Sequence, residues 1–379
     1  MSLNFGGNVK YNPLHKPDLK PIVLANRLKT ILTLFSTNNT DSYWLDKVEQ
    51  VLCECIKLCR IYNNGYVTFS EIHKLVCSRD YFCEKVAALR SDFQHNSLGT
   101  RTIFDLASSL DFFEKEFYCL DSRVLSILKS EITRITSLFI SDLDVSNTFC
   151  SDVNTLSFNG FADAIQEGKI VVLNMNIAEY RNLSKIIAAY LKLDFQTEVI
   201  SNISKHSVKP CAFICDEYSE YVTSTDAEFF SQSREAKCIN IVSTQSYTSI
   251  LNALKDENAT KVIIQNLINK LWFRTDDNFT IEEAQKLLGK EDKYRVSKSI
   301  SENAKSVSYN YLLNSFKSDD AAFSESYSLY AQHDFIYDTQ FFTQELSTFS
   351  CLALLSDGNQ VSNYGKVKLY PYFKTTMRR

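Results

Sequence analysis

The chain has 379 residues, of which 45% are hydrophobic and 23% are charged, and its formal net charge is −4. This composition excludes intrinsic disorder, and the length allows two ordinary domains with separate cores. The negative charge excludes a chain-wide affinity for nucleic acid, so any DNA contact has to be local or has to arise by assembly.

The eleven cysteines contain no Cys-x-x-Cys pair, and we interpret them as structural thiols in a reducing cytoplasm. No apolar run approaches the roughly 18 residues that span a bilayer. The N-terminal sequence MSLNFGGNVK does not have the pattern of a signal peptide. The sequence as given therefore predicts a soluble, cytoplasmic chain.

Residues 10–21, KYNPLHKPDLKP, contain three of the five prolines. Proline disfavours helix at the residue before it, so we expect an extended lead-in over residues 1–23. Apolar residues then recur with a period of about 3.6, as in ANRLKTILTLF and YWLDKVEQVLCECIKLCRIY. Thr68, followed three residues later by Glu71, predicts a capped helix start. We expect an all-helical domain over residues 24–165.

A different pattern begins at residue 169, where short apolar runs alternate with helical stretches. The runs are KIVVLNM (169–175), PCAFICDE (210–217), KCINIVSTQ (237–245), NKLWFRTDD (269–277) and FSCLALLSDG (349–358). Such alternation is typical of a parallel sheet buried on both faces, so we expect an α/β domain over residues 166–379. Thr280 with Glu283 predicts the start of the helix after the fourth run. The Ser-rich stretch 297–327 is interpreted as irregular.

Polar side chains follow several of these runs. Asp216 and Glu217 end the second run, Thr244 and Gln245 end the third, and Arg234 lies between the two runs. In open α/β sheets, ligands bind outside the carboxyl ends of the strands. In phosphoryl transfer, an Asp at such an end can hold Mg²⁺ through its water shell, and an adjacent Glu can orient the attacking water. A Thr-Gln pair can sense the γ-phosphate, and an Arg can neutralise charge at a neighbouring subunit's nucleotide.

Each of these features also has a structural interpretation. Acids and polar residues end many strands, Arg234 can be a solvated surface charge, and Asp276–Asp277 can cap the next helix. Another chemical alternative is a Mg²⁺-dependent nuclease that uses Asp216, Glu217 and Asp276, which requires the three carboxylates to converge. The order and spacing of the whole set, rather than any one residue, favour a nucleotide site.

That order resembles the second half of the motor domain of TraG/TraD-like type IV coupling proteins, the conjugation relatives of the hexameric ATPases FtsK and HerA. The resemblance is closest over residues 169–290, in GKIVVLNMNIAEYRNLSKIIAAYLKLDFQ, CAFICDEYSEYV, SREAKCINIVSTQSY and NKLWFRTDD. FICDE resembles their Walker B sequence, and STQS is similar to their glutamine-bearing sensor strand. The helical block is similar to the all-α domain inserted in that motor, and YNPLHKP resembles the segment that leads into the insertion.

The resemblance implies a RecA-like P-loop NTPase core, an α/β fold with a mostly parallel sheet, that carries an inserted all-α domain. Residues 1–23 and 166–379 then belong to the motor domain. By the same likeness Asp216 holds Mg²⁺ through water and Glu217 is the catalytic base. Gln245 becomes the γ-phosphate sensor beside a nucleotide-binding Thr244, and Arg234 becomes a finger that reaches the neighbouring subunit.

The resemblance further implies ATP and Mg²⁺ as cofactors and a homo-hexamer anchored to the bacterial inner membrane. Its expected partners are single-stranded DNA in transfer, the relaxase and other relaxosome proteins, and the type IV secretion channel. Yet no G-x-x-x-x-G-K-[ST] loop, which binds the phosphates in such motors, occurs in the 379 residues. We interpret the chain as the motor without its first strands, P-loop and anchor, unable to hydrolyse ATP alone. The alternative is a non-catalytic DNA- or protein-binding module derived from such an ATPase.

Overall fold

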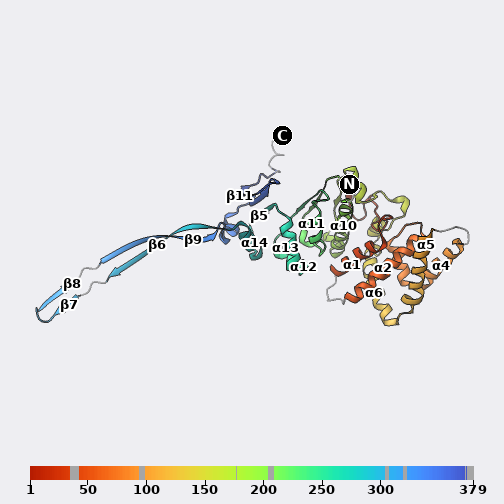
Figure 1. The fold of residues 1–379 in the computed structure, drawn as a ribbon, viewed down its shortest axis with the longest axis horizontal. Coiled ribbons are helices and arrows are strands. Elements are labelled where there is room, and N and C mark those ends of the chain that lie inside the picture. The colour runs from red at the N-terminus through yellow and green to blue at the C-terminus, as the bar shows by residue number, and fades with distance from the viewer. Residues whose placement is uncertain are drawn as a thin grey trace. The chain divides into compact units, whose positions relative to one another are not determined.

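The computed structural model describes residues 1–34, 42–93, 99–175, 177–203, 209–303, 307–318, 322–371 and 373. The chain divides into two compact units (Figure 1). The first unit comprises residues 1–245 and 250–266, and the second comprises residues 246–249 and 267–379. Within the described ranges, no helix is both long enough and apolar enough to cross a membrane.

The first half of the first unit is helical, as the apolar periodicity predicts. Its helices are α1 (Pro21–Leu34), α2 (Ser42–Tyr62), α3 (Phe69–Cys77), α4 (Arg79–Phe93), α5 (Thr100–Asp111), α6 (Ser122–Ile140), α7 (Leu143–Phe149) and α8 (Phe161–Glu167). The Thr68 hydroxyl accepts a hydrogen bond from the Glu71 amide at 3.2 Å, which confirms the predicted cap of α3. Phe69 of α3 stacks on Phe139 of α6 with ring centroids 3.8 Å apart, so these helices share one core.

The segment before α1 is extended or turned, in keeping with its prolines. At its start β1 (Ser2–Leu3) pairs in parallel with β2 (Val172–Leu173). Of the strand predicted over residues 169–175, only those two residues are paired. Both β1 and α10 (Asn182–Ser201), which follows the short α9 (Ile177–Tyr180), contribute side chains to the same core as the helical block.

The remainder of the first unit is α/β. Strand β3 (Cys211–Cys215) pairs in parallel with β4 (Cys238–Val242), and the register runs from Cys211 opposite Cys238 to Cys215 opposite Val242. Helix α11 (Asp226–Gln232) lies between them in sequence, and α12 (Tyr247–Leu254) and α13 (Glu257–Asn266) follow β4. The predicted parallel pairing is therefore confirmed for the second and third apolar runs.

The body of the second unit is an antiparallel sheet with one helix. Strand β10 (Ser350–Ser356) lies between β5 (Lys270–Trp272) and β11 (Val361–Lys368) and is antiparallel to both. The predicted strands at 269–277 and 349–358 are thus present, but the fourth run is not parallel to the strand beside it. Its core comprises Trp272, Ile281, Ala284, Phe341, Phe342, Leu346, Leu352 and Leu354.

Helix α14 (Asn278–Leu288) begins earlier than predicted. Its N-cap is Asp277, whose carboxylate accepts from the Thr280 amide at 2.9 Å and from the Thr280 hydroxyl at 2.6 Å. The prediction of Thr280 as the cap was wrong, because a carboxylate three residues upstream satisfies that amide first. The alternative that Asp277 is a capping residue is confirmed.

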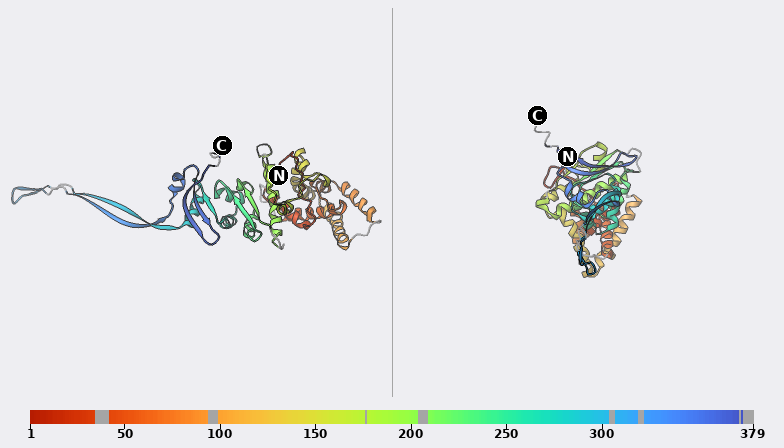
Figure 2. Two further views of the ribbon diagram at one scale, coloured as in Figure 1. Left: turned by 90° about the horizontal axis from the view of Figure 1, so that it is seen from above. Right: turned by 90° about the vertical axis from the view of Figure 1, so that its left-hand side faces the viewer.

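The Ser-rich stretch is not irregular, and that prediction was also wrong. Strand β6 (Lys290–Asn303) pairs antiparallel with β9 (Ala322–Phe335) through 14 residue pairs, and β7 (Val307–Asn310) pairs with β8 (Ser315–Ser318). Figure 1 and the left view of Figure 2 show β6 and β9 as a long two-stranded ribbon. The segments RVSKSIS and SESYSLY alternate serine with larger residues at a period of 2, which suits a strand despite the high serine content.

Candidate functional site

The ends of β3 and β4 bring Asp216 beside Ser243. The Ser243 amide donates to the Cys215 carbonyl at 2.9 Å, and the Tyr218 amide donates to the Ser243 carbonyl at 2.8 Å. The Ser243 hydroxyl also donates to Asp216 Oδ1. The parallel ladder therefore continues for a residue past each strand, and it fixes Asp216 at a shared edge with the residues that follow β4.

Glu217 occupies an unusual backbone conformation at this edge. Its φ is 49° and its ψ is 45°, the left-handed region, and its amide donates to Asp216 Oδ1 at 3.0 Å. A residue with a Cβ pays about 1 kcal/mol or more to adopt this region. At this turn the chain leaves the direction of β3 directly after Asp216. The side chains of Asp216 and Glu217 are both exposed.

A buried polar network lies directly behind this turn. The fully buried Asp226 carboxylate accepts from Lys192 Nζ at 2.7 Å and 2.5 Å and from the Tyr218 hydroxyl at 2.6 Å. It also accepts from Gln196 Nε2 at 2.9 Å and from the Thr223 amide at 3.0 Å and hydroxyl at 2.8 Å. Tyr218 immediately follows Glu217, so the network holds the β3 turn against α10.

Electrostatics favour the ionised form of Asp226 in this network. Burial raises the pKa of Asp226. The Lys192 ammonium and the hydrogen bonds from Lys192, Tyr218 and Gln196 together lower it by more than burial raises it, so the net pKa is below its usual value. Burial, followed by the Asp226 charge and hydrogen bond, raises the pKa of Tyr218 well above its ordinary range, so the phenol stays protonated and donates. The cluster is a satisfied ion pair rather than a proton donor or acceptor.

Sequence reasoning missed this network, although a signal was present. Lys192 and Asp194 lie in the middle of α10, a helix whose other central positions are almost all apolar and buried. Charged residues are seldom fully buried unless they are paired, so two of them inside an apolar helix predict partners elsewhere in the chain. For Lys192 that partner is Asp226.

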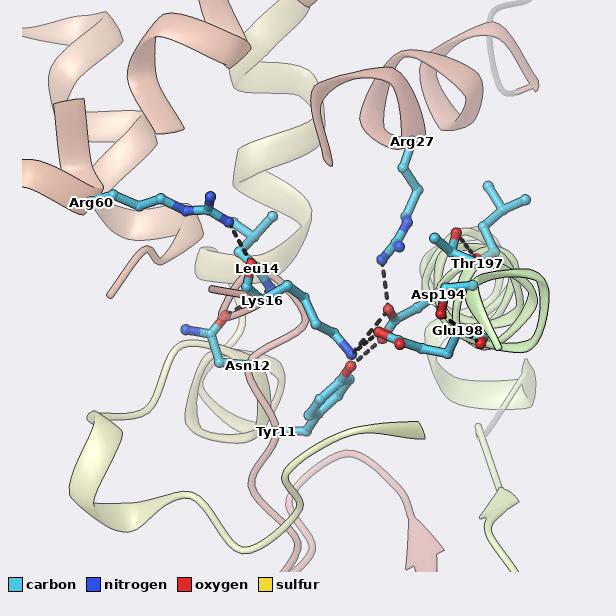
Figure 3. A network of polar contacts seen from close by, with 11 residues as sticks. Tyr11, Asn12, Leu14, Lys16, Arg27, Arg60, Asp194, Thr197 and Glu198 are labelled. Atoms are coloured by element: carbon cyan, nitrogen blue, oxygen red, sulfur yellow. Dashed lines mark hydrogen bonds and ion pairs between the residues drawn. The ribbon is translucent and has the colours of Figure 1, made fainter. Parts of the chain in front are cut away.

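The second partner set of α10 comes from the lead-in and α1, and Figure 3 shows it. Asp194 is fully buried and accepts from Arg27 Nη1 at 2.7 Å and from the Tyr11 hydroxyl. Lys16 Nζ lies 3.3 Å from Asp194 and 3.0 Å from Glu198. The YNPLHKP segment is therefore tied to the helix that also supports the β3 turn.

The other predicted site residues lie at separate places. Half-buried Thr244 and exposed Gln245 follow Ser243, the residue that borders Asp216 at the end of the β3–β4 pair. Arg234 is exposed in the turn between α11 and β4. Exposed Asp276 follows β5 in the second unit. No group of three or more His, Cys, Asp or Glu gathers around a possible metal position in the part of the chain that the structure describes, which gives the nuclease alternative no support.

One face of the β3–β4 pair departs from the expected burial. Ile214, Ile239 and Ile241 are exposed, Ile214 to 72%, and the register places Ile214 opposite Ile241 on that face. On the other face, Phe213 stacks near Phe195 of α10 with ring centroids 5.9 Å apart. Parallel strands are ordinarily covered on both faces. In the described residues the pair is covered on one face, so the expectation of burial on both was wrong for this chain.

These elements define a RecA-like α/β core joined to an all-α domain, and comparison with solved structures confirms that fold. The bacterial conjugative coupling protein TrwBdeltaN70 in its unbound monoclinic form matches with a TM-score of 0.60 and 11% identity, over 97% of this chain and 73% of that one. TrwB with the non-hydrolysable GTP analogue GDPNP matches at 0.59 and 9%, over 97% and 74%. TrwB with ADP and Mg²⁺ matches at 0.57 and 10%, over 97% and 73%.

A protein-family model adds a match in sequence to this likeness in fold. Residues 210–325 match the model described as the TraM recognition site of TraD and TraG. No curated protein sequence matches the chain. The resemblance of the chain to TraG/TraD-like type IV coupling proteins is thereby confirmed, by a sequence match in residues 210–325 and by fold over nearly all of the chain.

Proposed function

We propose that this chain is part of a hexameric, DNA-translocating ATPase that couples a conjugative relaxosome to a type IV secretion channel. The observation that carries the proposal is the Asp216–Glu217 turn at the end of β3, hydrogen bonded to Ser243 and followed across the ladder by Thr244 and Gln245. This edge lies in a chain with the fold of TrwB, a bacterial conjugative coupling protein.

Each residue at the edge has a role in the proposal. Asp216 holds hydrated Mg²⁺, and Glu217, at the turn that follows, accepts a proton from the attacking water. Thr244 and Gln245 contact the γ-phosphate side of the nucleotide, and Arg234 reaches the nucleotide of a neighbouring copy. Bound Mg²⁺ would supply charge neutralisation at the phosphate oxygens. The exposed carboxylates of Asp216 and Glu217 are hard oxygen donors that fit a hydrated Mg²⁺.

The residues fit the metal half of an ATP site but not its phosphate half. A phosphate-binding loop is absent from the 379 residues, and one face of the β3–β4 pair is apolar and exposed. Both observations support our interpretation that the phosphate-binding loop and the strands that cover this face are not among these 379 residues. ATP and Mg²⁺ are cofactors of the complete motor, and the present chain alone does not hydrolyse ATP.

The domain assignment and partners belong to the same proposal. Residues 1–23 and 166–379 form the motor part, and residues 24–165 form the inserted all-α domain on the cytoplasmic side. The description of the matched family model supports a relaxosome protein as a partner of residues 210–325. Single-stranded DNA, the relaxase and the secretion channel are the other partners that we propose for the hexamer.

The alternative function is a DNA- or protein-binding module that descends from such an ATPase and has lost catalysis. The observation that favours it is the missing phosphate loop. The two functions differ in their dependence on Glu217, because a binding module does not require a catalytic base.

A calorimetric titration of the chain with a non-hydrolysable ATP analogue and Mg²⁺ tests the half-site directly. We expect no binding near micromolar concentrations, because the P-loop supplies most of the phosphate contacts in such motors. Micromolar binding that disappears in the Asp216→Asn variant would mean that the chain contains a complete nucleotide site, and the half-site proposal would be wrong.

A further inference from the structure

The β6–β9 ribbon has two chemically different faces. Residues directly opposite each other in an antiparallel pair lie on the same face, so the register assigns each side chain. We call the first the apolar face, and its exposed members are Tyr294, Val296, Ile300, Tyr327 and Leu329. We call the second the serine face, and its central members are Ser297, Ser299, Ser301, Ser324, Ser326 and Ser328.

The apolar face is large for an uncovered surface. Its five members are between 55% and 72% exposed, and covering a side chain of this size contributes about 1.5–3 kcal/mol. An isolated two-stranded ribbon is at best marginally stable in water. The serine face shows that small polar residues suit this ribbon where it meets solvent. The large apolar residues of the other face therefore indicate that another surface covers it.

Two polar pairs of the apolar face lie within the ribbon. Lys298 forms an ion pair with Glu325 at 2.9 Å, and its ammonium lies 5.6 Å from the centre of the Tyr327 ring. His333 Nδ1 lies 2.9 Å from Asp292. This face therefore offers no excess of positive charge to a nucleic acid, whose binding depends on neutralising phosphates. It suits an apolar surface with a few matched charges.

The register makes the apolar face complementary to a second copy of itself. We consider two ribbons packed face to face and related by a two-fold axis that crosses the strands at the Val296–Leu329 pair. Each strand then lies antiparallel over its own counterpart, so residues two positions either side of the axis face each other. Tyr294 of one copy meets Lys298 of the other, and Tyr327 meets Ala331.

These meetings are favourable in size and charge. Tyr294 over Lys298 is a cation–π contact, and Tyr327 over Ala331 joins a large side chain to a small one. One step further from the axis, His333 of one copy faces Glu325 of the other, and Asp292 faces Ile300. No two like charges face each other directly in this arrangement, as an interface between identical surfaces requires.

The area is adequate for a weak, specific contact. Strands of 14 residues are about 45 Å long, and a two-stranded ribbon with its side chains is about 10 Å wide. One face covers about 450 Å², so two faces bury about 900 Å², which is below the roughly 1,200 Å² of standard specific interfaces and within the range of weak, transient contacts. A contact of this size gains strength when several copies are held together.

From this geometry we infer that the apolar face of the β6–β9 ribbon is an interface between copies of this chain, packed antiparallel about the Val296–Leu329 pair. The inference does not depend on the proposed ATPase function. It follows from the register, the exposure of five side chains and the internal pairing of the charges.

Sedimentation velocity of the full chain tests the inference, over about 1–200 μM. We expect the weight-average mass of the unmodified chain to rise with concentration. The Val296→Glu, Leu329→Glu variant places carboxylates at the axis, where Leu329 faces itself, and should weaken association more than tenfold. The Ser297→Glu, Ser328→Glu variant is the matched control, because this opposite pair adds the same charge on the serine face, one position away. It should associate within about twofold of the unmodified chain.

Cross-linking adds a readout that does not depend on how the charged variants fold. A short bis-maleimide should join Leu329→Cys to the same position of a second copy, because packed sheets lie about 10 Å apart, and peptide mass mapping locates the link. Ser328→Cys should not be joined in this way. A chain that stays monomeric throughout, as it would if another protein or a bilayer were the natural cover, overturns the inference. Equal association of both charged variants, or equal cross-linking at 328 and 329, overturns it as well.

Discussion

Replacing Asp226 with Ala should destabilise the first unit more than any exchange at the exposed edge. The variant leaves the Lys192 ammonium fully buried without its carboxylate, and Tyr218, Gln196 and Thr223 lose their common acceptor. Breaking a buried ion pair on one side costs about 3–5 kcal/mol. For a unit of this size each kcal/mol lowers Tm by about 2–4 °C. We therefore expect Tm to fall by about 6–20 °C.

Differential scanning calorimetry measures this loss, and two further variants make the reasoning sharper. Asp216→Asn, at the exposed edge, should change Tm by less than about 2 °C, since exposed substitutions usually cost within about 0.5 kcal/mol. The double variant Lys192→Met, Asp226→Leu should recover most of the stability, because replacing a buried pair by apolar residues is often neutral or better. A drop below 3 °C for Asp226→Ala, or a double variant no better than the single one, would refute our account of this network.

The pH dependence of the same network has a defined sign. The pKa of Asp226 is lower in the folded chain than its usual value, so its contribution is complete above about pH 4 and is lost as the pH falls through the folded pKa. Acid unfolding followed by circular dichroism should show a shallower loss of stability below about pH 4 in Asp226→Ala than in the unmodified chain. Parallel acid profiles for the two proteins would contradict this assignment.

Three other substitutions test the local arguments. Gly160→Ala should cost about 1–3 kcal/mol in chemical unfolding, because φ is 122° and the new Cβ would lie 2.8 Å from Lys16 Nζ; Gly65→Ala, with φ 86° and open space, should cost less. Asp277→Ala should cost about 0.5–2 kcal/mol through loss of the α14 cap, whereas Asp276→Ala, one residue earlier and exposed, should be nearly neutral. Asp194→Ala should destabilise by about 3–5 kcal/mol, because Arg27 and Lys16 lose their shared carboxylate; a smaller effect than that of Glu198→Ala would contradict the central place of Asp194.

Local rules predicted those parts of the fold whose signals are local. The 3.6-residue period revealed the helical block, and Thr68 marked the start of α3 because a hydroxyl cap needs only its own next three residues. The apolar runs at Cys211–Cys215 and Cys238–Val242 predicted parallel strands that lead into Asp216 and into Thr244. These predictions required no knowledge of distant partners.

The failures arise where distant residues or mixed signals decide the structure. The local sequence of α10 does not identify the partner of Lys192, which is Asp226, or the partners of Asp194, which are Tyr11 and Arg27. The charges in an apolar helix indicate only that such partners exist. Around β6 and β9 the serine-rich composition indicates an irregular stretch, whereas the period of 2 indicates a strand, and the structure follows the period of 2. The exposed face around Ile214 shows that an apolar strand pattern predicts a covered face even where no other part of the described chain covers it.

The central claim is that Asp216 and Glu217 act in a magnesium–nucleotide site, and DNA-stimulated ATP hydrolysis by a motor that combines this chain with a phosphate-binding loop tests it most directly. We expect that motor to hydrolyse ATP, and Glu217→Gln to lower kcat at least about 100-fold, as loss of a general base does. Glu220→Gln is the matched control, since Glu220 lies in the same turn and pairs with Lys185, and its kcat should stay within about twofold. Hydrolysis that survives Glu217→Gln as well as it survives Glu220→Gln would contradict the claim.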